Sequence, residues 1–209
     1  MKTYLTLSGF DASQIVSLIV KFGIESGDRI ILIRPAEEKD NRGEATIQAI
    51  RDLSRQIDSS IDVDINRVNH RNFEEMVISL IDLIKRSEGE IVVNLSGGPR
   101  EIFLAFTLAC LTQPDKIRKA TNYSDIDRSM NEIVLPNIKH VLDEKSKRIL
   151  EDVNENQPTT IKDVARRSNI SESTASRQIT ELVDMKALSS IAKGKTKQVF
   201  ITLTGKMLL

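Results

Sequence analysis

The chain has 209 residues, which is long for one domain and enough for two domains of about 100 residues each. Hydrophobic residues make up 40% and charged residues 29%, proportions that exclude a disordered, collagen-like or disulfide-scaffold protein. Basic and acidic residues number 30 each, but residues 141–209 hold 12 basic and 9 acidic residues and therefore carry a net charge of +3. A basic tail permits nucleic-acid binding, because affinity for the phosphate backbone depends on positive charge.

Two features bear on the compartment. Cys110 is the only cysteine, so the chain has no internal disulfide and suits a reducing compartment. No apolar run approaches the roughly 18–20 residues that a membrane span needs, and the chain enters an alternating strand pattern directly after its first residues. We therefore expect a cytoplasmic protein with no membrane partner.

The first 135 residues alternate between short apolar runs and amphipathic segments. Helical spacing of apolar residues occurs over Ile47–Ile57 and Phe73–Ile84. The predicted strands are Thr3–Ser8, Arg29–Arg34, Ile61–Val68, Glu90–Leu95, Lys116–Tyr123 and Asn131–Leu135. This alternation predicts an α/β domain, with a Rossmann-like, mostly parallel sheet and helices on both faces. The stretch Ile102–Leu111 is apolar on all sides, which indicates a helix buried either deep inside the domain or at a subunit interface.

Glycine-containing loops follow the first and fourth predicted strands. In the usual winding these strands are neighbours, and ligands bind at their carboxyl ends. Each loop opens a helix, whose free N–H groups favour an anion such as a phosphodiester. The candidate ligand-binding residues are Ser8, Gly9, Phe10, Asp11, Ser96, Gly97, Gly98, Pro99 and Arg100.

These loops lack the glycine spacing of a dinucleotide fold and the lysine of a nucleotide triphosphatase, so hydride transfer and ATP hydrolysis are disfavoured. Gly97-Gly98-Pro99 could also be a plain strand-to-helix turn. Asp11-x-x-Gln14 predicts a helix cap, and Asp11 could also meet a ribose hydroxyl. The charged loop Arg34–Gly43 either folds over a ligand or is a solvated connection.

Metal chemistry is not expected. His70 and His140 have no carboxylate or cysteine at metal-ligand spacing, and Cys110 lies in an apolar helix. We assign all three residues to structure and predict neither a metal site nor a resident cofactor.

Residues 136–142 are predicted to link the first domain, residues 1–135, to a second domain over residues 143–209. Three helical stretches follow the linker, Glu144–Val153, Thr160–Arg167 and Ser171–Met185, and the last two are joined by a short turn. This arrangement predicts a helix-turn-helix.

The third of these helices and a lysine-rich hairpin form the predicted DNA-binding surface. The inward face of the helix carries Ile170, Ala175, Ile179 and Leu182, whereas the outward face offers short hydrogen-bonding groups and one guanidinium, suited to a major groove. The hairpin, with predicted strands Leu188–Ile191 and Gln198–Leu203, has three lysines at its tip and would act as a wing against the phosphate backbone. The candidate DNA-binding residues are Ser173, Thr174, Ser176, Arg177, Lys193, Lys195 and Lys197.

With both halves described, the chain resembles the CRISPR-associated transcriptional regulators that join a CRISPR-associated Rossmann-fold (CARF) domain to a winged helix. On the first half the resemblance rests on Leu7–Asp11 and on Asn94–Glu101, which look like the family's two ligand-loop motifs. On the second half it rests on Ser171–Ile179 and the lysine-tipped hairpin, which many winged-helix regulators share.

The resemblance implies a homodimeric regulator whose two CARF domains form one cleft for a cyclic oligoadenylate, the four-nucleotide ring being the favoured size, within antiviral defence. Ligand binding is then expected to change the affinity of the winged helices for double-stranded DNA. Some relatives cleave the ring, for which Ser8, Ser96 and Arg100 are candidate assisting residues. A third alternative is a winged-helix regulator that senses an unrelated anionic metabolite.

Overall fold

The structure is a computed structural model that describes residues 1–37, 42–138, 142–193 and 196–209. The chain divides into two compact units, Met1–Val134 and Leu135–Leu209. Residue 137, which the sequence placed in a linker, is attached to the second unit, because the Asn137 N–H donates to Thr204 Oγ1 at 3.0 Å. The predicted linker residues 139–141, with His140, lie outside the described residues.

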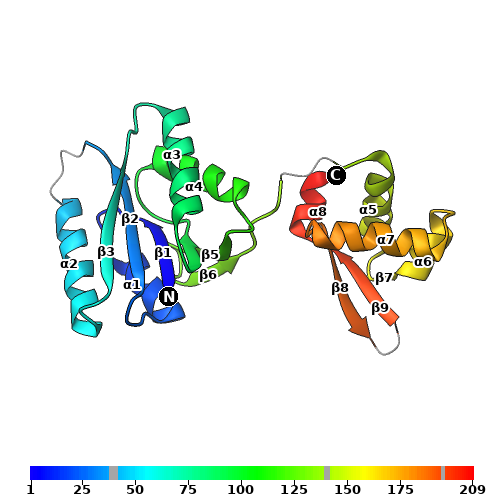
Figure 1. The fold of residues 1–209 in the computed structure, drawn as a ribbon, viewed down its shortest axis with the longest axis horizontal. Helices are drawn as coiled ribbons and strands as arrows, with labels where there is room; N and C mark the ends of the chain where they lie inside the picture. Colours follow the sequence, from blue (N-terminus) through cyan, green and yellow to red (C-terminus); the bar gives the residue numbers. More distant parts are fainter. Residues whose placement is uncertain (38–41, 139–141, 194–195) are drawn as a thin grey trace. The chain divides into compact units, whose positions relative to one another are not determined.

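The first unit is built on a six-stranded sheet in the order β3-β2-β1-β4-β5-β6 (Figure 1). The pairs between β3 and β5 are parallel, and β6 is antiparallel to β5. The strands are β1 (Lys2–Leu7), β2 (Arg29–Pro35), β3 (Asp62–Val68), β4 (Glu90–Asn94), β5 (Ile117–Tyr123) and β6 (Met130–Ile133). The Rossmann-like prediction is confirmed, and so is the expected neighbourhood of β1 and β4, where the strand order reverses.

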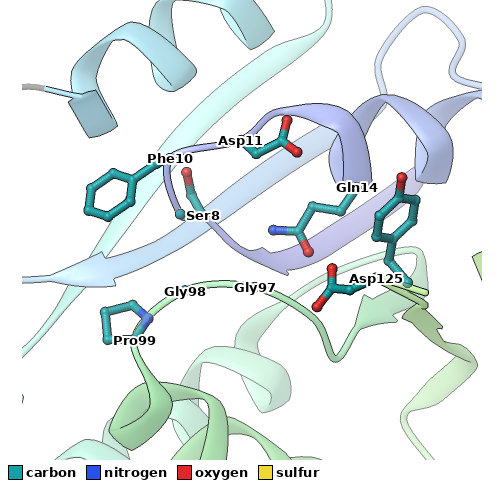
Figure 2. Close-up of a pocket in the computed structure, with 10 residues that line it drawn as sticks. Ser8, Phe10, Asp11, Gln14, Gly97, Gly98, Pro99 and Asp125 are labelled. Atoms are coloured by element: carbon teal, nitrogen blue, oxygen red, sulfur yellow. The ribbon is translucent and has the colours of Figure 1, made fainter. Parts of the chain in front are cut away.

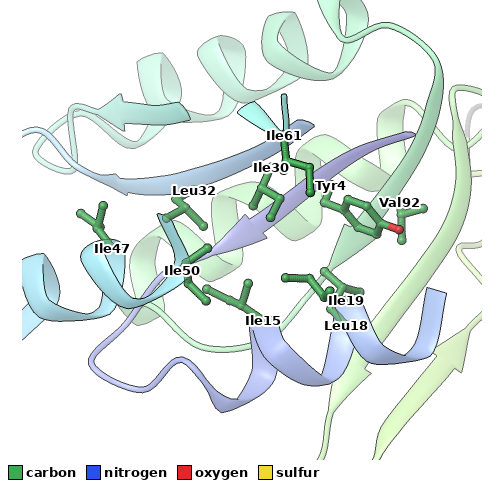
Figure 3. Close-up of a cluster of buried hydrophobic side chains, with 10 residues drawn as sticks. All are labelled: Tyr4, Ile15, Leu18, Ile19, Ile30, Leu32, Ile47, Ile50, Ile61 and Val92. Atoms are coloured by element: carbon green, nitrogen blue, oxygen red, sulfur yellow. The ribbon is translucent and has the colours of Figure 1, made fainter. Parts of the chain in front are cut away.

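Two helices cover each face of this sheet. Helices α1 (Ser13–Phe22) and α2 (Arg42–Ile57) pack on one face, where side chains from both helices and from β1, β2 and β4 form a continuous apolar core (Figure 3). Helices α3 (Phe73–Arg86) and α4 (Arg100–Thr112) pack against each other on the opposite face. Burial of these faces supplies the main driving force for folding of the unit.

Helix α4 is not buried on all sides. One side is fully buried in its own unit and carries Ile102, Ala105, Phe106, Ala109 and Cys110. The other side leaves Phe103, Leu104 and Leu108 exposed by 39%, 51% and 38%. Deep burial inside one domain, one of the two explanations of this apolar segment, is therefore wrong.

The second unit has seven helices and strands in its described part. Five of them were predicted from the sequence, and two were not. In chain order the seven are α5 (Glu144–Asn156), β7 (Thr159–Thr160), α6 (Ile161–Arg167), α7 (Glu172–Asp184), β8 (Leu188–Lys193), β9 (Thr196–Ile201) and α8 (Leu203–Leu208). The strands form an antiparallel sheet in the order β7-β9-β8. A core from α5, α6, α7 and the hairpin holds the unit together, and the winged helix-turn-helix prediction is confirmed.

The unpredicted elements are β7 and α8. The apolar run at the end of the chain predicted a strand as far as Leu203, but β9 ends at Ile201. Thr202 instead caps a short helix, since its Oγ1 accepts a hydrogen bond from the Gly205 N–H at 3.1 Å.

Candidate ligand pocket and DNA interface

The two glycine loops meet where β1 and β4 end, and they enclose a cavity of about 540 Å³. Figure 2 shows the loop after β1 on one side of this pocket and the Gly97–Pro99 turn across from it. The lining residues are Ser8, Gly9, Phe10, Asp11, Gln14, Gly97, Gly98, Pro99, Tyr123 and Asp125. Seven of the nine predicted ligand-binding residues are thus brought together, whereas Ser96 and Arg100 lie outside the lining.

Glycine is needed where the loops approach each other. Gly97 and Gly98 have φ angles of 75° and 67°, which side chains rarely adopt. A Cβ atom on Gly97 would lie 2.0 Å from the amide nitrogen of Gln14, and one on Gly9 would lie 3.3 Å from the Gly98 nitrogen. The two loops therefore approach each other so closely that a side chain at Gly9 or Gly97 would crowd the facing residue.

Gln14 does not form the helix cap that Asp11-x-x-Gln14 predicted. The Asp11 carboxylate instead accepts hydrogen bonds from the Ser13 N–H and hydroxyl, at 2.9 and 2.7 Å. The buried Gln14 amide donates to the Leu7 carbonyl at 3.1 Å and accepts from the Asn94 amide at 3.3 Å. The cap prediction is wrong because Gln14 satisfies buried polar groups of β1 and β4.

The pocket offers both donors and acceptors. The Ser13 N–H at the start of α1 is already bonded to Asp11, but α4 has no side-chain cap, so N–H groups of its first turn are available beside the loops. Hydrogen bonds from the Ser13 N–H and then its hydroxyl lower the pKa of Asp11, which is therefore ionised at neutral pH. Asp125 adds a second carboxylate at the rim, and the described lining contains no lysine, arginine or histidine. N–H groups suit phosphate oxygens, and carboxylates suit the hydroxyls of ribose.

The two predicted residues outside the lining have different positions. Ser96 is buried, and its Oγ accepts a hydrogen bond from the Tyr123 N–H, which ties the end of β5 to the loop after β4. Arg100 is the exposed first residue of α4, immediately after Pro99. Three lining residues, Gln14, Tyr123 and Asp125, are not among the predicted ligand-binding residues. The sequence pattern assigned Gln14 to a helix cap, and no local pattern tells which residues at the end of a later strand reach the two loops.

The second candidate interface is the outward side of α7. Ser171 caps this helix, and its Oγ shares hydrogen bonds with the hydroxyls of Ser173 and Thr174, at 2.9 and 2.8 Å. Arg177 is exposed, with no hydrogen bond or ion pair to any described residue, and Ser176 lies beside it, half-buried. The inward residues Ala175, Ile179 and Leu182 are buried as expected, so the polar side of α7 faces solvent.

The hairpin β8–β9 follows α7, as a wing should. Lys193 and Lys197 are exposed near its tip, where they lie opposite Thr196 and Ala192 in the antiparallel register. Lys195 lies outside the described residues. Two of the three predicted wing lysines are thus on the solvent side of the hairpin, in a position to meet a phosphate backbone.

Two further features, a metal site and a membrane-spanning helix, are absent from the described ranges. No group of three histidine, cysteine or acidic side chains gathers there with the spacing of a metal site. His70 is half-buried, and its Nδ1 finds no hydrogen-bond partner among the described residues. Within the same ranges, no helix has both the length and the apolar character to cross a membrane.

Together these features define a class of protein, a Rossmann-like domain with a pocket at its switch point joined to a winged helix. The match to known families is more specific. Residues 2–132 match the Csa3 CRISPR-associated Rossmann-like domain, and residues 142–186 match a winged helix-turn-helix DNA-binding domain. The chain belongs to the Csa3 CRISPR-associated Rossmann-like family and carries a DNA-binding winged helix.

The solved structures that the chain matches are distant in sequence. Protein VC1899 from Vibrio cholerae is 13% identical, with a TM-score of 0.46 over 99% of this chain and 65% of that one. Csm6 of Enterococcus italicus, solved bound to cyclic hexa-2′-fluoro-hexa-dAMP, is 13% identical, with a TM-score of 0.48 over 87% of this chain and 49% of that one. The chain thus spans about half to two thirds of these proteins. No curated protein matches it.

Proposed function

We propose that this protein is a homodimeric transcriptional regulator of a CRISPR system, whose Rossmann-like domain binds a cyclic oligoadenylate and thereby changes the affinity of the winged helix for DNA. The observation that carries the proposal is the cavity between Gly9–Phe10 and Gly97–Gly98 at the switch point of the sheet. Its volume of about 540 Å³ falls within the range of roughly 300–1,000 Å³ that ligand pockets occupy.

A ring of four nucleotides fits this arrangement by symmetry. An isologous dimer presents the same two loops twice, and a ring with two-fold symmetry meets both sets in the same way. Each pocket then needs to hold only half of the ring. In this proposal, loop N–H groups bind its phosphates, and the lining carboxylates of Asp11 and Asp125 bind its ribose hydroxyls.

The exposed apolar side of α4 supports the dimer. Phe103, Leu104 and Leu108 share one helix whose N-terminus opens at the pocket. Burying these side chains against a second copy removes apolar surface from water, at about 25 cal/mol per Å². The same contact brings two pockets onto one two-fold axis.

DNA binding by the second unit is supported by α7 and the wing. Arg177 and the serine and threonine hydroxyls are suited to base edges, and the hairpin lysines to phosphates. A dimer places two such units on a two-fold DNA site. Ring binding that shifts their spacing is expected to change DNA affinity by a coupling of about 1–3 kcal/mol.

Calorimetry with cyclic tetraadenylate tests the ligand, beside a panel of cyclic dinucleotides, linear oligoadenylate and nucleotide triphosphates. We expect binding of the cyclic tetraadenylate with one ring per dimer. Binding of another anion but of no cyclic oligoadenylate would favour the unrelated-metabolite alternative, and binding of none would overturn the ligand assignment. A DNA shift assay with and without the ring then measures the coupling.

The lining favours binding over cleavage of the ring. Cleavage assisted by a cationic side chain needs a lysine, arginine or histidine beside the phosphate, and the described lining holds none. Chromatography of the ring after prolonged incubation with the protein tests this point. Recovery of intact ring is expected, and a linear product would establish the ring nuclease alternative.

A further inference from the structure

Arg34, near the end of β2, is fully buried and lies behind the pocket. Arg34 is 0% exposed, and its side chain is the largest among the fully buried side chains of the described residues. One guanidinium nitrogen, Nη1, donates to Ser8 Oγ at 3.2 Å and to the Gly43 carbonyl at 2.9 Å. A guanidinium stays protonated in proteins, so a positive charge is held next to a residue of the pocket lining.

The contact with Arg34 determines whether the Ser8 hydroxyl acts as a donor or an acceptor toward other groups. Arginine has donors and no acceptor, so Ser8 Oγ must accept the hydrogen bond from Arg34. The hydrogen of the hydroxyl then remains to be donated, and it meets no acceptor among the described residues. Ser8 itself is held firmly, because its side chain is buried and its backbone N–H donates to the Ile33 carbonyl at 3.2 Å.

We infer that Arg34 is a positioning residue for the ligand, which holds the Ser8 hydroxyl as a donor to an anionic oxygen, namely a phosphate oxygen of the ring. This inference rests on the proposed function and deepens it. A hydroxyl that accepts from a charged donor becomes a stronger donor itself, because hydrogen bonds in a chain polarise one another. Arg34 thus acts on the pocket by polarising the Ser8 hydroxyl, although Arg34 is not part of the lining.

Gly43, the second residue of α2, makes room for this guanidinium. A Cβ atom at Gly43 would lie 1.6 Å from Arg34 Nη2, so any side chain there displaces the guanidinium. The change Gly43→Ala therefore disturbs Arg34 while leaving the pocket lining and the net charge unaltered. Alanine favours a helix over glycine, so weaker ring binding in this variant would reflect the displaced guanidinium rather than a weakened helix.

The test is a double-mutant cycle in the full chain, with cyclic tetraadenylate binding measured by calorimetry and folding by circular dichroism. Ser8→Ala and Arg34→Met are each expected to weaken binding by about tenfold to a hundredfold, the range for a hydrogen bond to a charged group. In the Ser8→Ala background, Arg34→Met should add no more than about twofold, because the pathway through Ser8 is already lost. Arg55→Met, on the exposed side of α2, removes one positive charge elsewhere and should bind as the wild type does.

The outcomes separate this inference from the proposed function. Absence of ring binding by the wild type overturns the proposed function and the inference with it. Wild-type binding that survives Ser8→Ala, or that Arg34→Met weakens equally in both backgrounds, overturns the inference alone. If Arg34→Met does not fold, Gly43→Ala takes its place in the cycle, and unchanged binding by Gly43→Ala overturns the inference.

Discussion

Gln14 connects the ends of β1 and β4, the two strands that the pocket loops follow. Its amide is 6% exposed and bonds to the Leu7 carbonyl, while the Asn94 amide bonds to it and to Thr6 Oγ1, at 3.3 and 3.2 Å. These groups are buried at the ends of β1 and β4, where the ladder between the strands stops. The Gln14 side chain thus bonds to both strand ends and helps to fix the spacing of the two loops that follow them.

Gln14→Ala is expected to lower the free energy of unfolding by about 1–3 kcal/mol, because the Leu7 carbonyl and the Asn94 amide lose a buried partner. Urea unfolding measures the change. Gln48→Ala is the matched control, since Gln48 is exposed on α2 and bonds only to Asp52, at 2.8 Å, among the described residues; a change below about 0.5 kcal/mol is expected there. Equal effects of the two substitutions would show that the Gln14 hydrogen bonds are unimportant.

Arg100→Glu is expected to abolish ring binding. Arg100 opens α4 next to Pro99, and the substitution replaces a cation adjacent in sequence to the Gly97–Pro99 turn with a charge that repels phosphate. A carboxylate in the first turn interacts favourably with the helix dipole, by about 0.3–1 kcal/mol, so the fold should not suffer. Calorimetry with cyclic tetraadenylate measures the loss, Arg100→Ala should show a smaller one, and DNA binding without ligand should persist. Equal binding by Arg100→Glu would mean that the phosphates lie elsewhere.

At the scale of elements, α7 and the wing are expected to contribute to DNA binding in different ways. Arg177→Ala should reduce discrimination against the wrong base by about 1–3 kcal/mol if the guanidinium reaches a guanine. Alanine at Lys193, Lys195 and Lys197 should weaken binding to all sequences alike and reduce the salt slope by about one unit for each lysine that contacts a phosphate. Titrations of specific and random duplexes at several salt concentrations distinguish the two. Unchanged affinity in both variants would contradict a DNA-binding role.

The order of elements was predictable because the periodicity of apolar residues and the turn residues between them are local features of the sequence. Apolar runs bounded by turns marked all six strands of the first unit within one or two residues of their ends. The short elements of the second unit were not predictable. Nothing in Thr159–Thr160 alone indicates a strand, since β7 exists only because β9 lies beside it. The run Thr202–Leu203 continues a strand pattern, but Thr202 caps α8, with its Oγ1 accepting from the Gly205 N–H.

The pocket was predictable in part for the same reason. Its glycine loops could be found from their positions after two strands and from the rule that these strands are neighbours. The contributions of Arg34, Tyr123 and Asp125 depend on contacts between residues far apart in the chain. The pair Arg34–Ser8, for example, spans 26 positions and exists because β1 and β2 run in parallel register.

For the whole molecule, the proposed dimer would connect the pocket to assembly through the exposed side of α4. The described part of the first unit leaves other apolar residues exposed, but Phe103, Leu104 and Leu108 gather on one helix that starts at the pocket. A ring shared by two subunits needs both pockets to face the two-fold axis. Dimerisation through α4, ligand binding and the pairing of winged helices on DNA are therefore expected to depend on one another.

Leu104→Glu in the full chain tests that dependence. Leu104 is 51% exposed in the single chain, so a glutamate there is tolerated by the folded unit but places a charge in the centre of an apolar interface. Sedimentation at micromolar concentration is expected to show a wild-type dimer and a Leu104→Glu monomer. The matched control is Val20→Glu on α1, at a residue 78% exposed, which should remain dimeric.

The monomer should then bind cyclic tetraadenylate far more weakly, because each subunit contributes half of the contacts. It should also lose most of its affinity for a two-fold DNA site while keeping the weaker binding of a single winged helix, since α7 and the wing are unaltered. A wild-type monomer would contradict the dimer. A Leu104→Glu dimer would place the interface on another surface, and a monomer that binds the ring as tightly as the wild type would show that one pocket is sufficient.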